Sequence, residues 1–154
     1  MSHFSYRQLM DDFCTRYGLE NASRLYDQAA LKINGVEFFL AHGGDGNEDG
    51  LVVCCKYGVA PVALLPMVMA RLLEANLKLF APGGMRFGLS PLRHEILLTG
   101  VVPMAGLHAE ALMDMLRHFA EDAHAWRTSY FLLSPPEDRP AEPFLTDEEY
   151  EDPA

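Results

Sequence analysis

The feature that most constrains the fold is an apolar segment over residues 66–80. Its apolar residues recur at steps of three and four, which predicts a helix, and Pro66 suits a first helical position because its missing N–H costs nothing there. The polar residues of the segment are Arg71, Glu74, Asn76 and Lys78. A helix that is apolar nearly all round is buried on more than one side. In a chain of 154 residues one sheet covers one side only, so we expect a second copy to cover the other in a homodimer.

Strand-like and helix-like segments alternate around this helix. Helical spacing predicts a first helix over 4–17 and a last helix over 107–130, the strongest periodicity in the chain. The dipeptide Asn34-Gly35 suits a tight turn, which predicts a hairpin between strands over 25–33 and 36–41. Further strands are predicted over 51–57, 85–89 and 95–102. The predicted fold class is therefore α+β, in the order α-β-β-β-α-β-β-α, with three helices and an antiparallel five-stranded sheet.

The negative charge is concentrated at the C-terminal end. Residues 135–154 hold eight acidic residues against Arg139 alone, so this segment carries −7 of the formal net charge of −10. An acidic, proline-rich segment cannot bury enough apolar surface to offset its ordering entropy. We therefore predict one α+β domain over 1–133 and an acidic disordered tail over 134–154. The acidic residues are Glu137, Asp138, Glu142, Asp147, Glu148, Glu149, Glu151 and Asp152.

Several classes of function lack the residues that they need. Nucleic-acid binding requires clustered Lys and Arg, and neither part of the chain offers such a patch. No stretch has the apolar length of a membrane span, and acidic residues stand where a signal peptide would be apolar, so we expect a cytoplasmic protein. The phosphate-loop, dinucleotide-binding and nucleophile-elbow motifs are also missing from the sequence.

Two candidate chemical sites are weak. Residues 45–50, DGNEDG, match the opening of a calcium loop, but Lys56 stands where its last ligand should be, so a solvated loop is the better interpretation. Cys14, Cys54 and Cys55 are odd in number and lack metal or redox spacing, which favours buried reduced thiols. We therefore expect no metal, no cofactor and no enzymatic activity. An enzyme that uses Cys14 or a histidine is the less favoured alternative.

Three motifs, taken with the order of the elements, carry a family resemblance. They are Arg71-Leu72-Leu73-Glu74-Ala75-Asn76 in the apolar helix, Phe87-Gly88-Leu89-Ser90-Pro91 after it, and the run 119–127 that ends in Ala125-Trp126-Arg127. In this order they resemble the class I type III secretion chaperones of the Tir-chaperone (CesT) family. The resemblance covers about residues 4–127. The glycine-rich loop over 43–50 and the tail depart from it, and we hypothesise that the tail masks or mimics a basic partner surface.

The resemblance implies a function without chemistry of its own. It implies a small acidic homodimer in the bacterial cytoplasm that binds the extended N-terminal segment of one or more secreted effectors, keeps it competent for secretion and prevents premature aggregation. Components of the secretion apparatus, such as its ATPase, are further partners that it allows. The alternative is a regulatory protein of the same fold that sequesters a regulator.

The resemblance also implies where partners bind. An extended peptide can add to a sheet edge while its apolar side chains enter pockets beside the first helix. The matching effector-binding residues are Phe4, Leu9, Phe13, Tyr17, Val36, Phe38 and Leu40. The dimer interface would fall on Val68, Leu72, Ala75 and Leu79, with Met85 and Phe87 nearby.

Overall fold

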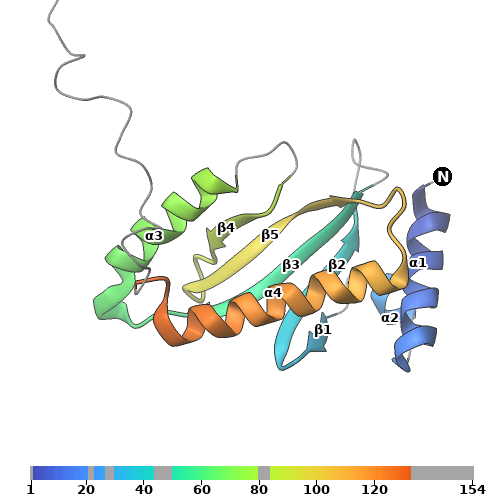
Figure 1. The fold of residues 1–154 in the computed structure, drawn as a ribbon, viewed down its shortest axis with the longest axis horizontal. Helices are drawn as coiled ribbons and strands as arrows, with labels where there is room; N and C mark the ends of the chain where they lie inside the picture. The colour runs from blue at the N-terminus through green and yellow to red at the C-terminus, as the bar shows by residue number, and fades with distance from the viewer. Residues whose placement is uncertain (1, 21–22, 27–29, 44–49, 80–83, 133–154) are drawn as a thin grey trace, which may run out of the picture.

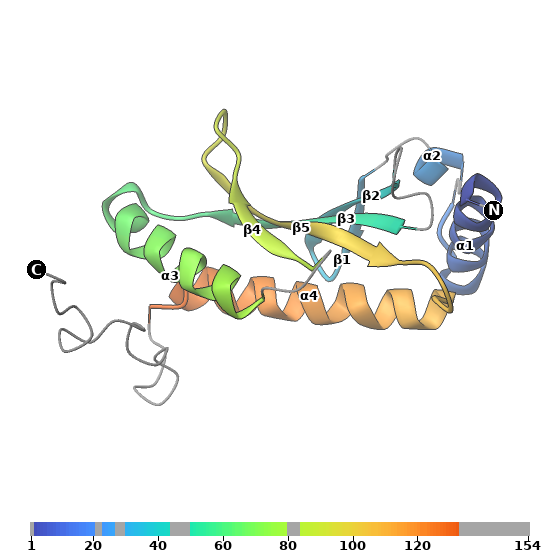
Figure 2. The ribbon, with the colours of Figure 1, turned by 90° about the horizontal axis from the view of Figure 1, so that it is seen from above.

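The fold is seen in a computed structural model that describes residues 2–20, 23–26, 30–43, 50–79 and 84–132 (Figure 1). Five strands form one antiparallel sheet in the order β1-β2-β3-β5-β4. Figure 2 shows that α4 runs along one face of this sheet, whereas no described helix runs along the other. The predicted α+β class and the antiparallel five-stranded sheet are confirmed.

The N-terminal part forms two helices and a hairpin. Helix α1 (Ser2–Tyr17) and the short α2 (Ser23–Tyr26) precede strands β1 (Ala30–Ile33) and β2 (Val36–His42). Asn34 and Gly35 have φ angles of 49° and 78°, as a two-residue hairpin turn requires. The strand predicted over 25–33 is wrong at residues 25 and 26, which are helical. The buried Leu25 side chain belongs to the core there, and its carbonyl accepts a 2.6 Å hydrogen bond from the Tyr6 hydroxyl.

Strand β3 (Gly50–Val59) crosses the middle of the sheet and is interrupted by an irregularity between Lys56 and Gly58. Arg127 binds the carbonyls that this irregularity frees: its Nε donates to Tyr57 O at 2.5 Å and its Nη2 donates to Lys56 O at 3.1 Å. Gly58 has a φ of +135°, which L side chains rarely adopt, so glycine is the residue that fits here.

Helix α3 (Leu65–Lys78) follows a short 3₁₀ turn, η1 (Val62–Leu64), and has a proline in its first turn as predicted. It ends two residues before the predicted limit, and Phe80 lies outside the described residues. Helix α3 packs beside β4 (Arg86–Leu89), the strand at one edge of the sheet. The helix therefore flanks the sheet instead of lying across it (Figure 2).

The C-terminal part supplies the layer that covers the sheet. Strand β5 (Glu95–Pro103) pairs with β3 and β4, and α4 (Ala109–Ser129) then returns along the sheet. The helix begins at His108, whose Nδ1 accepts from the Ala111 N–H at 3.3 Å, and ends at Tyr130 in the left-handed conformation. The predicted helix over 107–130 is confirmed to within two residues at each end.

The core lies between α1, α4 and one face of the sheet. Alternate residues of β2 and β3 are fully buried on that face, as the two-residue period of a strand requires. Trp126 is completely buried with its ring 5.8 Å from Tyr57 and 5.1 Å from Tyr130. Within the described ranges, no helix has both the length and the apolar character needed to cross a membrane.

Candidate partner-binding site

The residues predicted to bind an effector lie mainly inside the protein. Leu9 and Phe13 on α1 are buried, and Val36, Phe38 and Leu40 on β2 are fully buried on the face that α1 and α4 cover. Tyr17 at the end of α1 is half-buried, with its ring 5.4 Å from that of Phe13. The side chain of Phe4 lies outside the described residues. Five of the seven thus form core in this structure, and contact between them and a partner stays a prediction that requires this layer to open.

The dimer residues predicted on α3 also face their own chain in part. Val68 is 0% exposed and Leu72 is 2% exposed. Phe87, predicted nearby, places its ring 5.0 Å from Tyr57 and 6.1 Å from Phe131. Ala75 and Met85 are half-buried, and Leu79 keeps part of its surface. Val68 and Leu72 thus attach α3 to the rest of the chain, whereas Leu79, 41% exposed, stays open to a partner, and the predicted dimer interface stays a prediction.

The opposite side of α3 carries an exposed apolar stripe, which we call the α3 stripe: Met67, Ala70, Leu73 and Leu77. These positions follow one another at steps of three and four, so they share one side of the helix. Leu73 is 65% exposed and Leu77 is 71% exposed. Contiguous exposed apolar surface of this kind is a candidate for contact with a partner.

The two edges of the sheet differ. At the β4 edge, the side-chain amide of Asn76 on α3 receives the Phe87 N–H at 2.6 Å and donates to Phe87 O at 3.1 Å. The outward backbone groups of Phe87 are thereby occupied by the protein's own side chain. At the β1 edge, the two-residue turn makes Ile33 and Val36 a hydrogen-bonded pair, so the N–H and C=O of Lys32 point away from β2. The β1 edge therefore offers the Lys32 backbone groups to another strand, whereas at the β4 edge the groups of Phe87 are bonded to Asn76.

A cavity of about 600 Å³ opens between α3, β4 and α4. Its walls are mainly apolar, and charged or polar side chains stand among them at Lys78, His118 and Asp122. The apolar lining residues include Tyr57, Leu79, Met85, Phe87, Phe119 and Phe131. A cavity lined in this way accepts an apolar side chain, but it provides no cluster of reactive groups.

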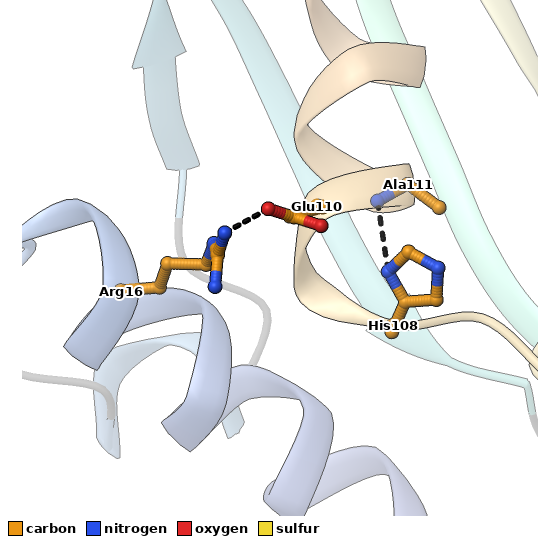
Figure 3. A network of polar contacts seen from close by, with 4 residues as sticks. All are labelled: Arg16, His108, Glu110 and Ala111. Carbon is orange, nitrogen blue, oxygen red and sulfur yellow. Dashed lines mark hydrogen bonds and ion pairs between the residues drawn. The ribbon is translucent and has the colours of Figure 1, made fainter.

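A polar junction holds α1 against the start of α4 (Figure 3). The Arg16 guanidinium pairs with the Glu110 carboxylate, while His108 beside it closes the first turn of α4. Glu110 stands in that first turn, where the helix dipole favours a negative charge. Both members of the ion pair are about half exposed, so the pair orients α1 more than it stabilises the fold.

The sheet face away from α4, which we call the open face, carries a charged cluster. Lys56 Nζ lies 2.8 Å from Glu37 Oε2, and Lys32 is the cross-strand partner of Glu37 on β1. The hydrogen bond and charge of Lys56, together with the charges of Lys32 and Arg93, lower the pKa of Glu37 below its ordinary value. The charges of three cations therefore act on the Glu37 carboxylate, and Glu95 on β5 adds a second carboxylate to this face.

The thiols are poorly placed for chemistry. Burial raises the pKa of Cys14 and Cys54, and it raises the pKa of Cys55 to about 12. The thiolate is the nucleophile, so raised pKa values work against a cysteine-dependent reaction at neutral pH. Among the described residues no group of three or more His, Cys, Asp or Glu side chains is arranged to hold a metal ion. Residues 45–49 of the calcium-loop match lie outside the described part.

The comparison with known protein families decides the assignment. Residues 8–127 match the Tir chaperone protein (CesT) family. The chain belongs to this family. The match extends over all five strands, over α3 and over most of α4, so the whole sheet and its covering layer fall within it. A comparison with curated proteins finds no significant match.

Solved structures share the fold of this CesT-family chain. In the crystal structure of the ExsC-ExsE complex, a chain 20% identical has a TM-score of 0.68, over 87% of this chain and 100% of that one. In the HopA1-SchA chaperone-effector complex the identity is 16% and the TM-score is 0.58, and the match covers 82% of this chain and 95% of that one. In the heterodimeric ExoU-SpcU complex from the type III secretion system of Pseudomonas aeruginosa, the matching chain is 17% identical and has a TM-score of 0.55. The match covers 80% of this chain and 98% of that one. At such identities the likeness establishes the fold.

Sequence reasoning missed three features of this CesT-family chain. The side of α3 that faces solvent carries Leu73 and Leu77, yet apolar residues stand on both sides of that helix and spacing alone does not choose between them. Asn76 was part of the family motif, but its bond to Phe87 depends on how α3 lies beside β4. The cluster around Glu37 was missed, although the hairpin register predicts that Lys32 lies opposite it.

Proposed function

We propose that this chain is a type III secretion chaperone that binds the extended N-terminal segment of one or more effectors, keeps it competent for secretion and prevents premature aggregation. The observation that carries the proposal is the membership of residues 8–127 in a chaperone family. The solved complexes that share the fold, two of them named for a chaperone-effector pair or the type III secretion system, support it. The proposed chaperone acts by binding and uses no cofactor.

The β1 edge is the proposed place for an extended effector segment. An added strand is held by main-chain hydrogen bonds, and these need backbone groups that no other part of the chain occupies. The Lys32 backbone groups at β1 point away from β2, whereas Asn76 occupies those of Phe87 at β4. Side chains of the added segment would then lie near the end of α1, where Tyr17 keeps accessible surface.

The α3 stripe is the proposed homodimer contact. Met67, Leu73 and Leu77 leave one apolar side of α3 exposed to solvent. A helix that is apolar on both sides is stabilised when a partner covers the exposed one. A second copy that packs stripe against stripe around a two-fold axis would bury both copies at once. The proposed seam lies on the side of α3 opposite Val68 and Leu72.

The proposal is tested by capture of the tagged full-length protein from its own host under secretion-inducing conditions, with bound proteins identified by mass. We expect a stoichiometric effector whose N-terminal segment is required for binding. Lys32→Pro removes the outward N–H at the β1 edge without touching the ladder to β2, so it should weaken capture at least tenfold, while Lys32→Ala should not. Absence of any partner would overturn the proposal, and a partner that is retained in the cell would favour the regulatory alternative.

A further inference from the structure

The cations of the open face stand out in a protein whose net charge is negative. Lys32, Glu37 and Lys56 follow one another across β1, β2 and β3 in one row of the sheet, and Arg93, in the turn between β4 and β5, is near enough for its charge to act on the same carboxylate. Glu37 carries one negative charge here, and Glu95, two residues before Leu97 on β5, adds a second on the same face, so the three cations keep an excess of one positive charge. The cluster therefore keeps a local excess of positive charge while the whole chain carries −10.

Apolar side chains surround these charges on the open face. Phe39 lies under the Lys56 ammonium at 5.2 Å, and Val52 and Leu97 belong to the same face on β3 and β5. All three are half-buried although no described helix runs along this face (Figure 2). The surface thus suits an extended segment that is acidic and carries a few large apolar residues.

We propose that the occupant of the open face is the chain's own C-terminal segment, with residues 147–152 on the cluster around Glu37. This segment, Asp147-Glu148-Glu149-Tyr150-Glu151-Asp152, has five carboxylates in six positions, and Phe144, Leu145 and Tyr150 are apolar partners for the open face. The sign of its charge is opposite to that of the cluster and the same as that of the chain as a whole. The open face is therefore where this segment gains attraction.

The chain is long enough to make this contact within one molecule. The last described residues are anchored at β4, where the Phe131 ring lies 6.1 Å from Phe87. The row from β4 to β2 spans three strand spacings, about 15 Å. Residues 133–146 can extend to about 45 Å, which is sufficient to pass around the sheet edge. Because the segment is tethered, its effective concentration at the open face reaches the millimolar range, so weak attraction suffices.

The inference is tested on the full-length protein without any effector, so its outcome is independent of the proposed chaperone function. Amide chemical shifts of the wild type are compared with those of a full-length variant that carries Asp147→Asn, Glu148→Gln, Glu149→Gln, Glu151→Gln and Asp152→Asn. We expect shift differences at Lys32, Glu37 and Lys56 and their neighbours, reduced at least twofold when NaCl is raised from 50 to 500 mM.

Charge reversal on the open face supplies the matched comparison. In a Lys32→Glu or Arg93→Glu background, the same five neutralisations should no longer change the shifts of the open face. Arg117→Glu on the exposed side of α4 makes an equal change of charge away from this face and should leave the differences intact. No shift differences, differences confined to the cavity between α3 and α4, or differences that vanish on dilution would each overturn the proposal.

Discussion

The side-chain amide of Asn76 forms two hydrogen bonds with the backbone of Phe87, one as donor and one as acceptor. An asparagine amide has the same donor and acceptor pair as a peptide group, so this side chain takes the place of a neighbouring strand at the edge of β4. The contact joins the middle of the sheet edge to the last turn of α3. It therefore ties α3 to the sheet and occupies the outward backbone groups of Phe87 at the same time.

Replacing Asn76 with Ala should destabilise the protein by about 1–3 kcal/mol, because two half-buried backbone groups lose their partner. Asn76→Asp keeps the acceptor for the Phe87 N–H but loses the donor, so it should be destabilising as well. Urea unfolding followed by circular dichroism measures both. Gln8→Ala on exposed α1 is the control. An Ala variant as stable as the wild type would show that water replaces the amide.

Arg127→Met should destabilise the protein by about 1–3 kcal/mol, since the carbonyls of Lys56 and Tyr57 then lose their donors. Methionine keeps the length of the side chain, so the change reports on hydrogen bonding more than on packing. Arg117→Met on the same helix removes an exposed cation–π contact with Tyr17 at 5.9 Å, which contributes about 0.5–1 kcal/mol, so its effect should be the smaller of the two. Equal effects of the two variants would contradict the role given to Arg127. Denaturant unfolding of the three proteins measures the difference.

His108→Ala should destabilise the protein by about 1 kcal/mol, because the Ala111 N–H in the first turn of α4 loses its side-chain acceptor. His108→Asp should restore or exceed the wild-type stability, because aspartate is a preferred capping residue and its charge suits the helix N-terminus. Thermal unfolding at pH 7 measures the order. A stability for Ala equal to that for Asp would show that the cap contributes nothing.

The Glu37–Lys56 pair should contribute less stability in acid. The folded state lowers the pKa of Glu37, chiefly through the Lys56 hydrogen bond, so the unfolded chain takes up this proton more readily. The contribution is present above the ordinary carboxyl pKa and is lost as the pH falls through the lowered folded value. The Tm difference between wild type and Glu37→Gln should thus shrink from pH 7 to about pH 3. In a Lys56→Met background this pH dependence should be smaller, and an unchanged dependence would contradict the assignment.

Leu73→Glu and Leu77→Glu should each convert a dimer into a monomer, because a charge placed in the α3 stripe must be desolvated when two copies meet. Light scattering over a series of micromolar concentrations gives the mass. Leu92→Glu is the matched control, since Leu92 is 93% exposed at the turn between β4 and β5. A wild-type monomer at these concentrations would remove the basis for the seam, and a dimer that survives both substitutions would place it elsewhere.

The predictable parts of this fold rest on local signals. The hairpin at Asn34-Gly35 and the amphipathic α4 follow from turn chemistry and periodicity, which few residues determine. The short α2 was not predictable in the same way: Leu25 and Tyr26 suit a strand, and tertiary contacts with α1 make them helical. Tertiary packing also decides which side of α3 is covered, because its apolar residues face both ways.

The candidate site was less predictable than the fold, for a related reason. Phe13 and Phe38 have the residue types expected both of a peptide pocket and of a core, and the structure buries them between α1 and the sheet. The difference between the two sheet edges depends on one amide, that of Asn76, meeting one strand. Such a contact joins two elements through a particular packing, and a single sequence does not specify that packing.

The position of the open β1 edge also bears on stoichiometry. Strand β1 and strand β4 form opposite edges of the sheet, and α3 lies beside β4. A pair of chains joined through α3 would therefore carry its two available edges at its far ends, facing away from the shared axis. Each copy could then hold one extended segment independently, which gives two bound chains per pair. A single segment long enough to follow the outer contour of the pair could instead occupy both edges, and this arrangement gives one bound chain per two copies.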